Sequence, residues 1–186
     1  MRQSKKDHLL ATATQLFLKN GFQITGIDLI IKEAAIAKMT LYNNFKNKDE
    51  LILAVVENYA KQFAERITKR AEAMSDDPLI VLISIFDAYK EWYADPQFFG
   101  CAFQRAALEF PDTDHPVHQL AAGHNQFIRN YILEQCNRLE IDSAADLAEQ
   151  LHVLINGAST GALLYADPEQ AEAAKDAAKL LIQSYV

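Results

Sequence analysis

Cysteine, glycine and proline are scarce in this sequence, and long apolar runs are missing. The two cysteines, Cys101 and Cys136, are too few for a disulfide framework, as is usual in the reducing cytoplasm. Six glycines and five prolines argue against a loop-rich all-β fold and against a collagen-like repeat. The longest apolar stretch, Leu79 to Phe86, has eight residues including Ser84, whereas a membrane span needs about 18. We therefore expect a cytoplasmic protein with no membrane partner and no secretory signal segment.

Positive charge is concentrated at the N-terminal end, although the whole chain has a net charge of −7. Residues 1–48 carry eight lysines and arginines against three acids, whereas the rest of the chain carries ten against 22. A basic head on an acidic body indicates a protein that binds a polyanion at one end, although an unevenly charged solvated surface gives the same pattern. The basic residues of the head are Arg2, Lys5, Lys6, Lys19, Lys32, Lys38, Lys46 and Lys48.

Apolar residues recur at helical spacing in nearly every segment, which predicts an all-α fold of about nine helices. Thr25 with Asp28, and Asn47 with Glu50, have the spacing of capping boxes. Asp114 is the predicted N-cap of a helix that begins at Pro116. The predicted helices span residues 8–20, 25–34, 38–45, 47–74, 78–93, 98–110, 116–139, 143–165 and 169–184.

The second and third helices are short and are separated by residues 35–37, which is the pattern of a helix-turn-helix motif. Leu41 and Phe45 are four residues apart on the third helix, so we expect both to face the core. The other side chains then face solvent with chemistry that suits base edges in a major groove or, at Tyr42, a phosphate. A small polar helix on the surface of a bundle is the alternative. The solvent-facing residues are Lys38, Met39, Thr40, Tyr42, Asn43 and Asn44.

Residues 8–55 resemble the DNA-binding domain of the TetR family of bacterial transcriptional regulators. The matching residues are Leu10, Ala13, Phe17, Gly21, Phe22, Thr25, Ile30, Ala34, the run from Lys38 to Phe45 and the run from Lys48 to Leu51. The resemblance implies an N-terminal three-helix helix-turn-helix DNA-binding domain over residues 1–48 and a larger helical effector and dimerisation domain over residues 49–186. This chain has Ala35 where the family usually has Gly, and Ala37 where it usually has a Ser cap.

The resemblance also implies that the third helix enters the major groove of a double-stranded DNA operator. Lys48 and the N–H groups at the start of the fourth helix form a candidate anion site. Asp28 lies where some family members carry a basic residue that contacts bases, so no direct contact is expected from the second helix. The predicted DNA-binding residues are Thr25, Lys38, Met39, Thr40, Tyr42, Asn43, Asn44 and Lys48, with Lys5, Lys6 and Lys46 as further candidates for phosphates.

The last two helices each carry a stripe of small and apolar residues, which suits either internal packing or a helix pair that meets its twin across a two-fold axis. The TetR resemblance implies the second arrangement, a homodimer held by a four-helix bundle. Two copies of a short recognition helix would then bind half-sites about one turn of DNA apart. The predicted interface residues are Leu147, Leu151, Leu154, Ala158, Ala162, Ala174, Ala178 and Leu181.

The middle of the chain is rich in aromatic residues, which form either plain core or the lining of a small-molecule site. The family resemblance implies an effector pocket there. The candidate ligand-binding residues are Phe63, Phe86, Tyr89, Trp92, Phe103, Phe127 and Tyr131. The identity of the effector does not follow from the sequence.

Cys101 is a candidate redox sensor, or else a small buried apolar residue. The histidines lack metal-site spacing, and no nucleophile elbow or dinucleotide motif occurs, so we expect no metal, no cofactor and no enzyme activity. The sequence therefore predicts a ligand-responsive repressor that binds a palindromic operator as a dimer. The alternative is a helical ligand-binding or thiol redox-sensing module without specific DNA binding.

Overall fold

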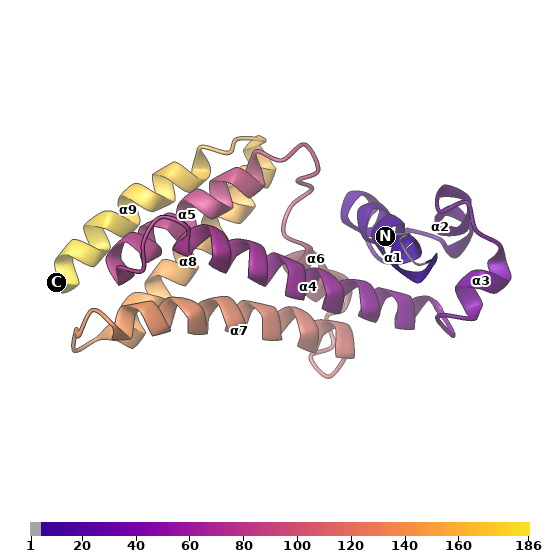
Figure 1. The fold of residues 1–186 in the computed structure, drawn as a ribbon, viewed down its shortest axis with the longest axis horizontal. Coiled ribbons are helices and arrows are strands. Elements are labelled where there is room, and N and C mark those ends of the chain that lie inside the picture. The colour runs from indigo at the N-terminus through magenta and orange to yellow at the C-terminus, as the bar shows by residue number, and fades with distance from the viewer. Residues whose placement is uncertain (1–4) are drawn as a thin grey trace. The chain divides into compact units, whose positions relative to one another are not determined.

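The computed structural model describes residues 5–186, and within that part of the chain it contains nine α-helices and no strand (Figure 1). The predicted all-α class is therefore confirmed. None of the described helices is both long enough and apolar enough to cross a membrane. Arg2, one of the basic residues of the head, lies outside the described residues. The helices are α1 (Lys5–Asn20), α2 (Ile27–Glu33), α3 (Lys38–Tyr42), α4 (Lys48–Glu72), α5 (Pro78–Tyr93), α6 (Ala102–Glu109), α7 (Pro116–Asn137), α8 (Ala144–Tyr165) and α9 (Gln170–Tyr185).

The described residues form two compact units. The first, which we call the reading unit, contains the chain up to Lys61 together with Ala102–Gly123. The second, which we call the body unit, contains Gln62–Cys101 and His124–Val186. The predicted domain division after residue 48 remains a prediction. The compact units differ from it because α6 groups with the N-terminal helices.

The core of the reading unit is built on α1. Leu9, Ala13 and Phe17 are four residues apart along this helix and are fully buried, because one helical face repeats at that spacing. The ring of Phe22, which follows α1, lies 5.5 Å from the ring of Phe17 and 6.3 Å from that of Phe110. Aromatic contacts therefore join α1 to the residue that follows α6.

The body unit is built around α5, α8 and α9, which pack side by side (Figure 1). Helix α5 is the most apolar of the three and buries nine of its 16 residues. Its polar groups are satisfied inside the unit, since the hydroxyl of Tyr93 lies 2.7 Å from that of Ser159 on α8. Burial raises the pKa of Tyr93 well above its usual value, so its hydroxyl stays protonated.

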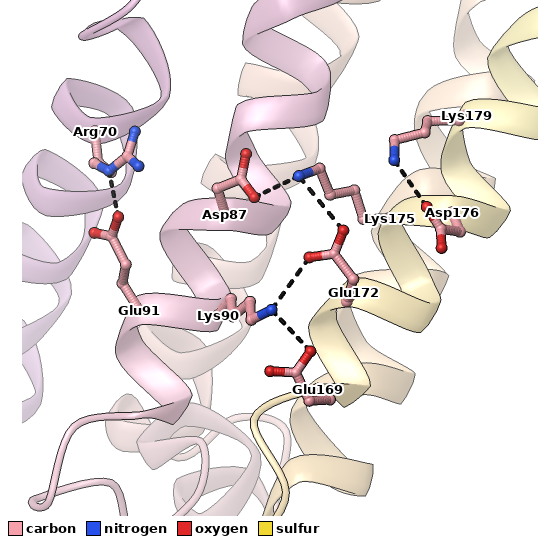
Figure 2. A network of polar contacts seen from close by, with 9 residues as sticks. All are labelled: Arg70, Asp87, Lys90, Glu91, Glu169, Glu172, Lys175, Asp176 and Lys179. Carbon is pink, nitrogen blue, oxygen red and sulfur yellow. Dashed lines mark hydrogen bonds and ion pairs between the residues drawn. The ribbon is translucent and has the colours of Figure 1, made fainter.

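A network of ion pairs joins α9 to α5 (Figure 2). Lys175 Nζ lies 2.6 Å from Asp87 Oδ1 and 3.7 Å from Glu172 Oε1. Lys90 Nζ lies 2.8 Å from Glu169 Oε2 and 3.3 Å from Glu172 Oε2. Because Glu172 lies between the two lysines, the five charges act as one connected group.

The helix starts follow local hydrogen bonding. Asp77 caps α5 by accepting from the N–H groups of Leu79 and Ile80. At the start of α4 the predicted cap is confirmed, because Asn47 accepts from the N–H of Glu50 at 2.8 Å. The other half of this capping box is shifted by one residue, since Glu50 accepts from the N–H of Lys46 at 2.6 Å rather than from that of Asn47.

Two other predicted caps are wrong. The residue that precedes α2 is Gly26, without a side-chain cap, so Thr25 and Asp28 form no capping box. Before α7 the cap is His115, whose Nδ1 accepts from the N–H of Val117, rather than Asp114. Helix α2 therefore begins two residues later than the sequence pattern suggested, whereas α7 begins at Pro116 as predicted and differs only in its capping residue.

Helix α6 begins at Ala102, four residues after the predicted start. Gly100 has a φ of +90°, which is not a helical conformation, so α6 cannot include this residue. A Cβ at this position would also lie 2.7 Å from a methyl carbon of Leu163 on α8. This turn therefore requires glycine for two separate reasons.

Candidate nucleic-acid interface

A left-handed residue forms the turn between α2 and α3. Ala35 has a φ of +49°, a conformation that an L-residue with a Cβ adopts only at a cost. Its neighbour Ala34 is buried, and the carbonyl oxygen of Ala34 accepts a hydrogen bond from Nε2 of His8 at 3.1 Å. Helix α1 therefore holds the turn in place although Ala35 strains it.

Helix α3 presents one face to the core and the other to solvent. Leu41 and Phe45 are buried, as predicted from their spacing. Lys38 and Asn43 are exposed, and Met39 is 69% exposed. Met39 thus presents an apolar side chain to solvent beside the polar side chains of Lys38 and Asn43.

Two of the predicted base-contacting residues are already engaged within the unit. The side-chain amide of Asn44 donates to the carbonyl oxygen of Thr40 at 2.7 Å, and both residues are half-buried. Lys38 Nζ lies 3.2 Å from Asp28 Oδ1 in an exposed ion pair between α3 and α2. Asn43 and Met39 are therefore better presented to a ligand than Asn44.

The anion site predicted at the start of α4 is partly engaged within the unit. Lys48 Nζ donates to the carbonyl oxygen of Gln23 at 2.6 Å. The capping box described above takes up the N–H groups of Lys46 and Glu50, so these two donors are not available to a phosphate. The loop before α2 is thereby tied to the start of α4.

Thr25 supports this loop from inside. Its side chain is 1% exposed, and its hydroxyl donates to the carbonyl oxygen of Gly21 at 2.6 Å. The hydroxyl of Thr25 thus faces the protein interior. Tyr42, by contrast, is 43% exposed. The Nζ atom of Lys6 lies 5.7 Å from the centre of the Phe45 ring.

Helix α3 begins without a side-chain cap. Ala37 has the extended backbone of an N-cap residue, with φ −73° and ψ 147°, but no side-chain oxygen to accept from the first turn. Together with Ala35, this leaves the five-residue helix α3 dependent on its tertiary contacts for stability.

Three of the seven predicted effector-site residues, Phe63, Tyr89 and Trp92, form an aromatic cluster in the body unit together with His124. The ring of Phe63 lies 4.6 Å from that of Trp92, 5.8 Å from that of Tyr89 and 5.4 Å from that of His124. Burial, with a smaller contribution from nearby His152, lowers the pKa of His124 to about 4. The cluster therefore contains a neutral imidazole at pH 7.

The other predicted effector-site residues are distributed differently. Phe86 and Tyr131 are buried in the body unit, where the hydroxyl of Tyr131 donates to Glu72 Oε1 at 2.9 Å. Phe127 is 46% exposed. Phe103 belongs to the reading unit, where its ring lies 5.7 Å from that of Tyr59. The sequence could not separate these residues because all of them lie on helices with similar apolar patterns.

The residues predicted for the dimer interface lie mostly inside the protomer. Those that are buried within the body unit are Leu147, Leu151, Ala158, Ala162, Ala174 and Ala178. Leu154 and Leu181 are half-buried. The exposed row on α8 consists instead of Val153, Gly157, Thr160 and Leu164, and on α9 Ala173 and Leu180 are exposed.

The two cysteines have different environments. Cys136 is buried, and burial raises the pKa of its thiol to about 12. Cys101 is partly exposed between Gly100 and the start of α6. Across residues 5–186, no three or more His, Cys, Asp or Glu side chains are grouped so as to hold a metal ion.

Comparison with known proteins gives matches along most of the chain. Residues 9–55 match the family described as bacterial regulatory proteins, tetR family. Residues 78–178 match the tetracyclin repressor-like C-terminal domain. The HTH-type transcriptional regulator YjdC of Escherichia coli is 22% identical over 156 residues, which is 82% of this chain and 80% of that protein.

Two further relatives have closer or more local similarity. The crystal structure of SCO4454, a TetR-family transcriptional regulator from Streptomyces coelicolor, superposes with a TM-score of 0.91 at 29% identity, over 97% of this chain and 95% of that one. The HTH-type transcriptional repressor NemR of Escherichia coli is 33% identical over 64 residues, which is 34% of this chain and 32% of that protein.

Proposed function

Because the chain belongs to the TetR family of bacterial transcriptional regulators, we propose that it acts as a homodimeric repressor that binds a palindromic operator and releases it when a small molecule binds. The cytoplasm, where bacterial DNA is found, is the compartment in which this activity is expected. The observation that carries the proposal is the exposed face of α3, which presents Lys38, Met39 and Asn43 to solvent. The ion pair that Lys38 forms with Asp28 is itself exposed.

Each of these side chains has a distinct ligand among the base edges. The amide of Asn43 pairs bidentately with N6 and N7 of adenine, whereas Lys38 donates to O6 and N7 of guanine. Met39 contacts the methyl group of thymine. Tyr42 and Lys48 lie beside this face and contact phosphates once the duplex competes for them.

The proposed dimer uses the exposed rows of α8 and α9 rather than the buried stripes. Val153 is 59% exposed, and Leu164 and Leu180 are each 70% exposed. Gly157 lies between Val153 and Leu164 on the same face of α8, so a partner helix can approach closely. The proposed interface therefore uses the two helices predicted from the sequence, α8 and α9, but other residues on them.

The proposed effector site is the aromatic cluster of Phe63, Tyr89, Trp92 and His124. Rings supply apolar area to a ligand, and a neutral imidazole can both donate and accept a hydrogen bond. A ligand that binds the conformation with low DNA affinity better by a few kcal/mol is sufficient to change operator occupancy.

Selection of bound fragments from a pool of random duplexes at moderate salt tests the proposal. We expect a palindromic consensus whose half-sites are about one helical turn apart. The variant Asn43→Ala is expected to lose about 1–3 kcal/mol of discrimination at one base position of each half-site. Enrichment of no sequence would contradict specific operator binding.

A thiol-sensing module remains the second candidate function, because Cys101 is partly exposed at the start of α6 whereas Cys136 is buried. If this function holds, Cys101→Ser abolishes the response of the protein to peroxide and leaves its affinity for DNA unchanged. An unaltered response of Cys101→Ser excludes the thiol of Cys101 as the sensor.

A further inference from the structure

Three backbone groups lose their helical partners where α1 ends. Gly21 has a φ of +102°, so the chain leaves the helix there after a last bond from the N–H of Gly21 to the carbonyl oxygen of Phe17. In a continued helix the N–H of Phe22 would donate to the carbonyl oxygen of Leu18. Both of these groups, and the N–H of Gln23, therefore need other partners.

Helix α6 supplies a partner to each of the three groups. Oε1 of Glu109 accepts from the N–H of Phe22 at 3.2 Å, and Oε2 accepts from the N–H of Gln23 at 2.7 Å. Nη1 of Arg105 donates to the carbonyl oxygen of Leu18 at 2.8 Å. Arg105 and Glu109 are four residues apart and so lie on one face of α6.

The peptide of Gln23 links this arrangement to the candidate DNA-binding residues. Glu109 holds its N–H, while Lys48 donates to its carbonyl oxygen at 2.6 Å. Two residues farther along the loop, Thr25 is anchored to the carbonyl oxygen of Gly21, and α2 begins at Ile27. A charged pair on α6 thus fixes the loop that sets where α2 and the start of α4 lie.

We propose that Arg105 and Glu109 are positioning residues for DNA binding, which hold the helix-turn-helix motif in its binding geometry without touching DNA. This proposal rests on the proposed function, because it concerns affinity for the same operator. The close packing supports it, since a Cβ at Gly21 would lie 2.9 Å from Oε1 of Glu109.

Electrostatics and positioning predict opposite signs for the variant Glu109→Gln. Removal of one negative charge from a DNA-binding unit by itself strengthens attraction to a polyanion. Loss of the carboxylate places an amide –NH2 group against a backbone donor, and so disturbs the loop. We expect the operator affinity of Glu109→Gln to fall roughly tenfold.

The matched control is Glu57→Gln, which makes the same charge change at an exposed position on α4 within the reading unit. Its operator affinity is expected to stay equal or to rise slightly. The salt dependence of Glu109→Gln should match that of the wild type, because no phosphate contact is lost, whereas Lys48→Ala should lower the slope by about one.

Amide hydrogen exchange gives a readout that does not depend on DNA. The N–H groups of Phe22 and Gln23 should exchange at least tenfold faster in Glu109→Gln than in the wild type or in Glu57→Gln. Operator affinity of Glu109→Gln equal to or above that of the wild type, or unchanged exchange at these amides, overturns the proposal. A wild-type protein that selects no duplex instead refutes the proposed function, and the exchange rates then still decide whether the contacts of Glu109 hold the loop.

Discussion

Helix α3 in the reading unit and helix α5 in the body unit differ in how their polar groups find partners. In the body unit the charges of α5 and α9 pair with one another, and Asp77 caps α5. In the reading unit α3 has no side-chain cap, its turn is strained at Ala35, and Met39 and Asn43 project into solvent. Groups that are satisfied internally stabilise the protein, whereas groups left open are those that a ligand can satisfy.

The largest expected effect concerns the one part of the body unit that resembles the open face of α3, the exposed apolar row on α8. Leu164→Glu places a charge on the proposed interface and should convert the dimer to a monomer, as measured by sedimentation. Operator affinity should fall at least about a hundredfold, because the two half-sites are then bound independently. Leu164 is 70% exposed in the protomer, so the protomer itself should remain folded.

Met74→Glu is the matched control for that substitution, since Met74 is 78% exposed and lies outside both rows. We expect it to leave the protein dimeric. A dimeric Leu164→Glu variant would show that another surface joins the two copies.

The next largest effect concerns pH. Burial lowers the pKa of His124 to about 4, and burial also lowers the pKa of His152. The unfolded chain therefore binds more protons below pH 6.5, and the free energy of unfolding falls with pH between about 6.5 and 4. For His124 alone the loss at pH 5 should be about 2 kcal/mol relative to pH 7.5.

Urea unfolding at the two pH values measures this loss. His124→Leu removes the titrating group, so its free energy of unfolding should depend less on pH than that of the wild type. An equal pH dependence in both proteins would mean that folding does not lower the pKa of His124.

Removal of an ion pair from the network in Figure 2 should have an effect of intermediate size on the free energy of unfolding. The side chain of Lys175 is 16% exposed, so Lys175→Ala leaves Asp87 without its ion-pair partner in a partly buried site, whereas Glu172 keeps Lys90. We expect a loss of about 1.5 kcal/mol of unfolding free energy, between the values for exposed and buried pairs. Lys179→Ala is the matched control, because its pair with Asp176 is exposed and should contribute little to the free energy of unfolding.

The smallest expected effect tests the open features of the reading unit. Ala37→Ser adds a hydroxyl to a residue that already has N-cap backbone geometry, and should stabilise the protein by about 0.5–1 kcal/mol. Thermal unfolding of the variant measures this gain. No gain would indicate that the first turn of α3 already has its hydrogen bonds satisfied by water at no cost.

The regular parts of the fold could be predicted from the sequence because their signals are local. Helix α5 spans Pro78–Tyr93 as predicted, since Asp77 and Pro78 mark its start and Asp95 and Pro96 follow its end. The burial of Leu41 and Phe45 followed from helical spacing, and so did the solvent-facing side of α3. The family matches agree with the resemblance carried by the residues of this region.

Contacts between distant residues were beyond the sequence pattern. Lys175 and Asp87 are 88 residues apart, and Glu109 and Phe22 are 87 apart, so no spacing rule connects them. Apolar periodicity identifies the packed face of α8 but does not say what covers it, so it cannot distinguish Leu147, which is buried within the protomer, from a residue that meets a partner. The predicted cap at Thr25 was wrong for a similar reason, because the sequence does not distinguish a buried hydroxyl from a capping hydroxyl.

The inclusion of α6 in the reading unit has a consequence for recombination. A chimeric regulator made by joining residues 1–61 to a foreign C-terminal half would lack Arg105, Glu109 and the ring of Phe110. The transplanted N-terminal segment would then carry the predicted DNA-binding residues without the contacts that hold the loop before α2. On the proposed role of Arg105 and Glu109, exchange of operator specificity between two regulators requires segments 1–61 and 102–123 to be moved together.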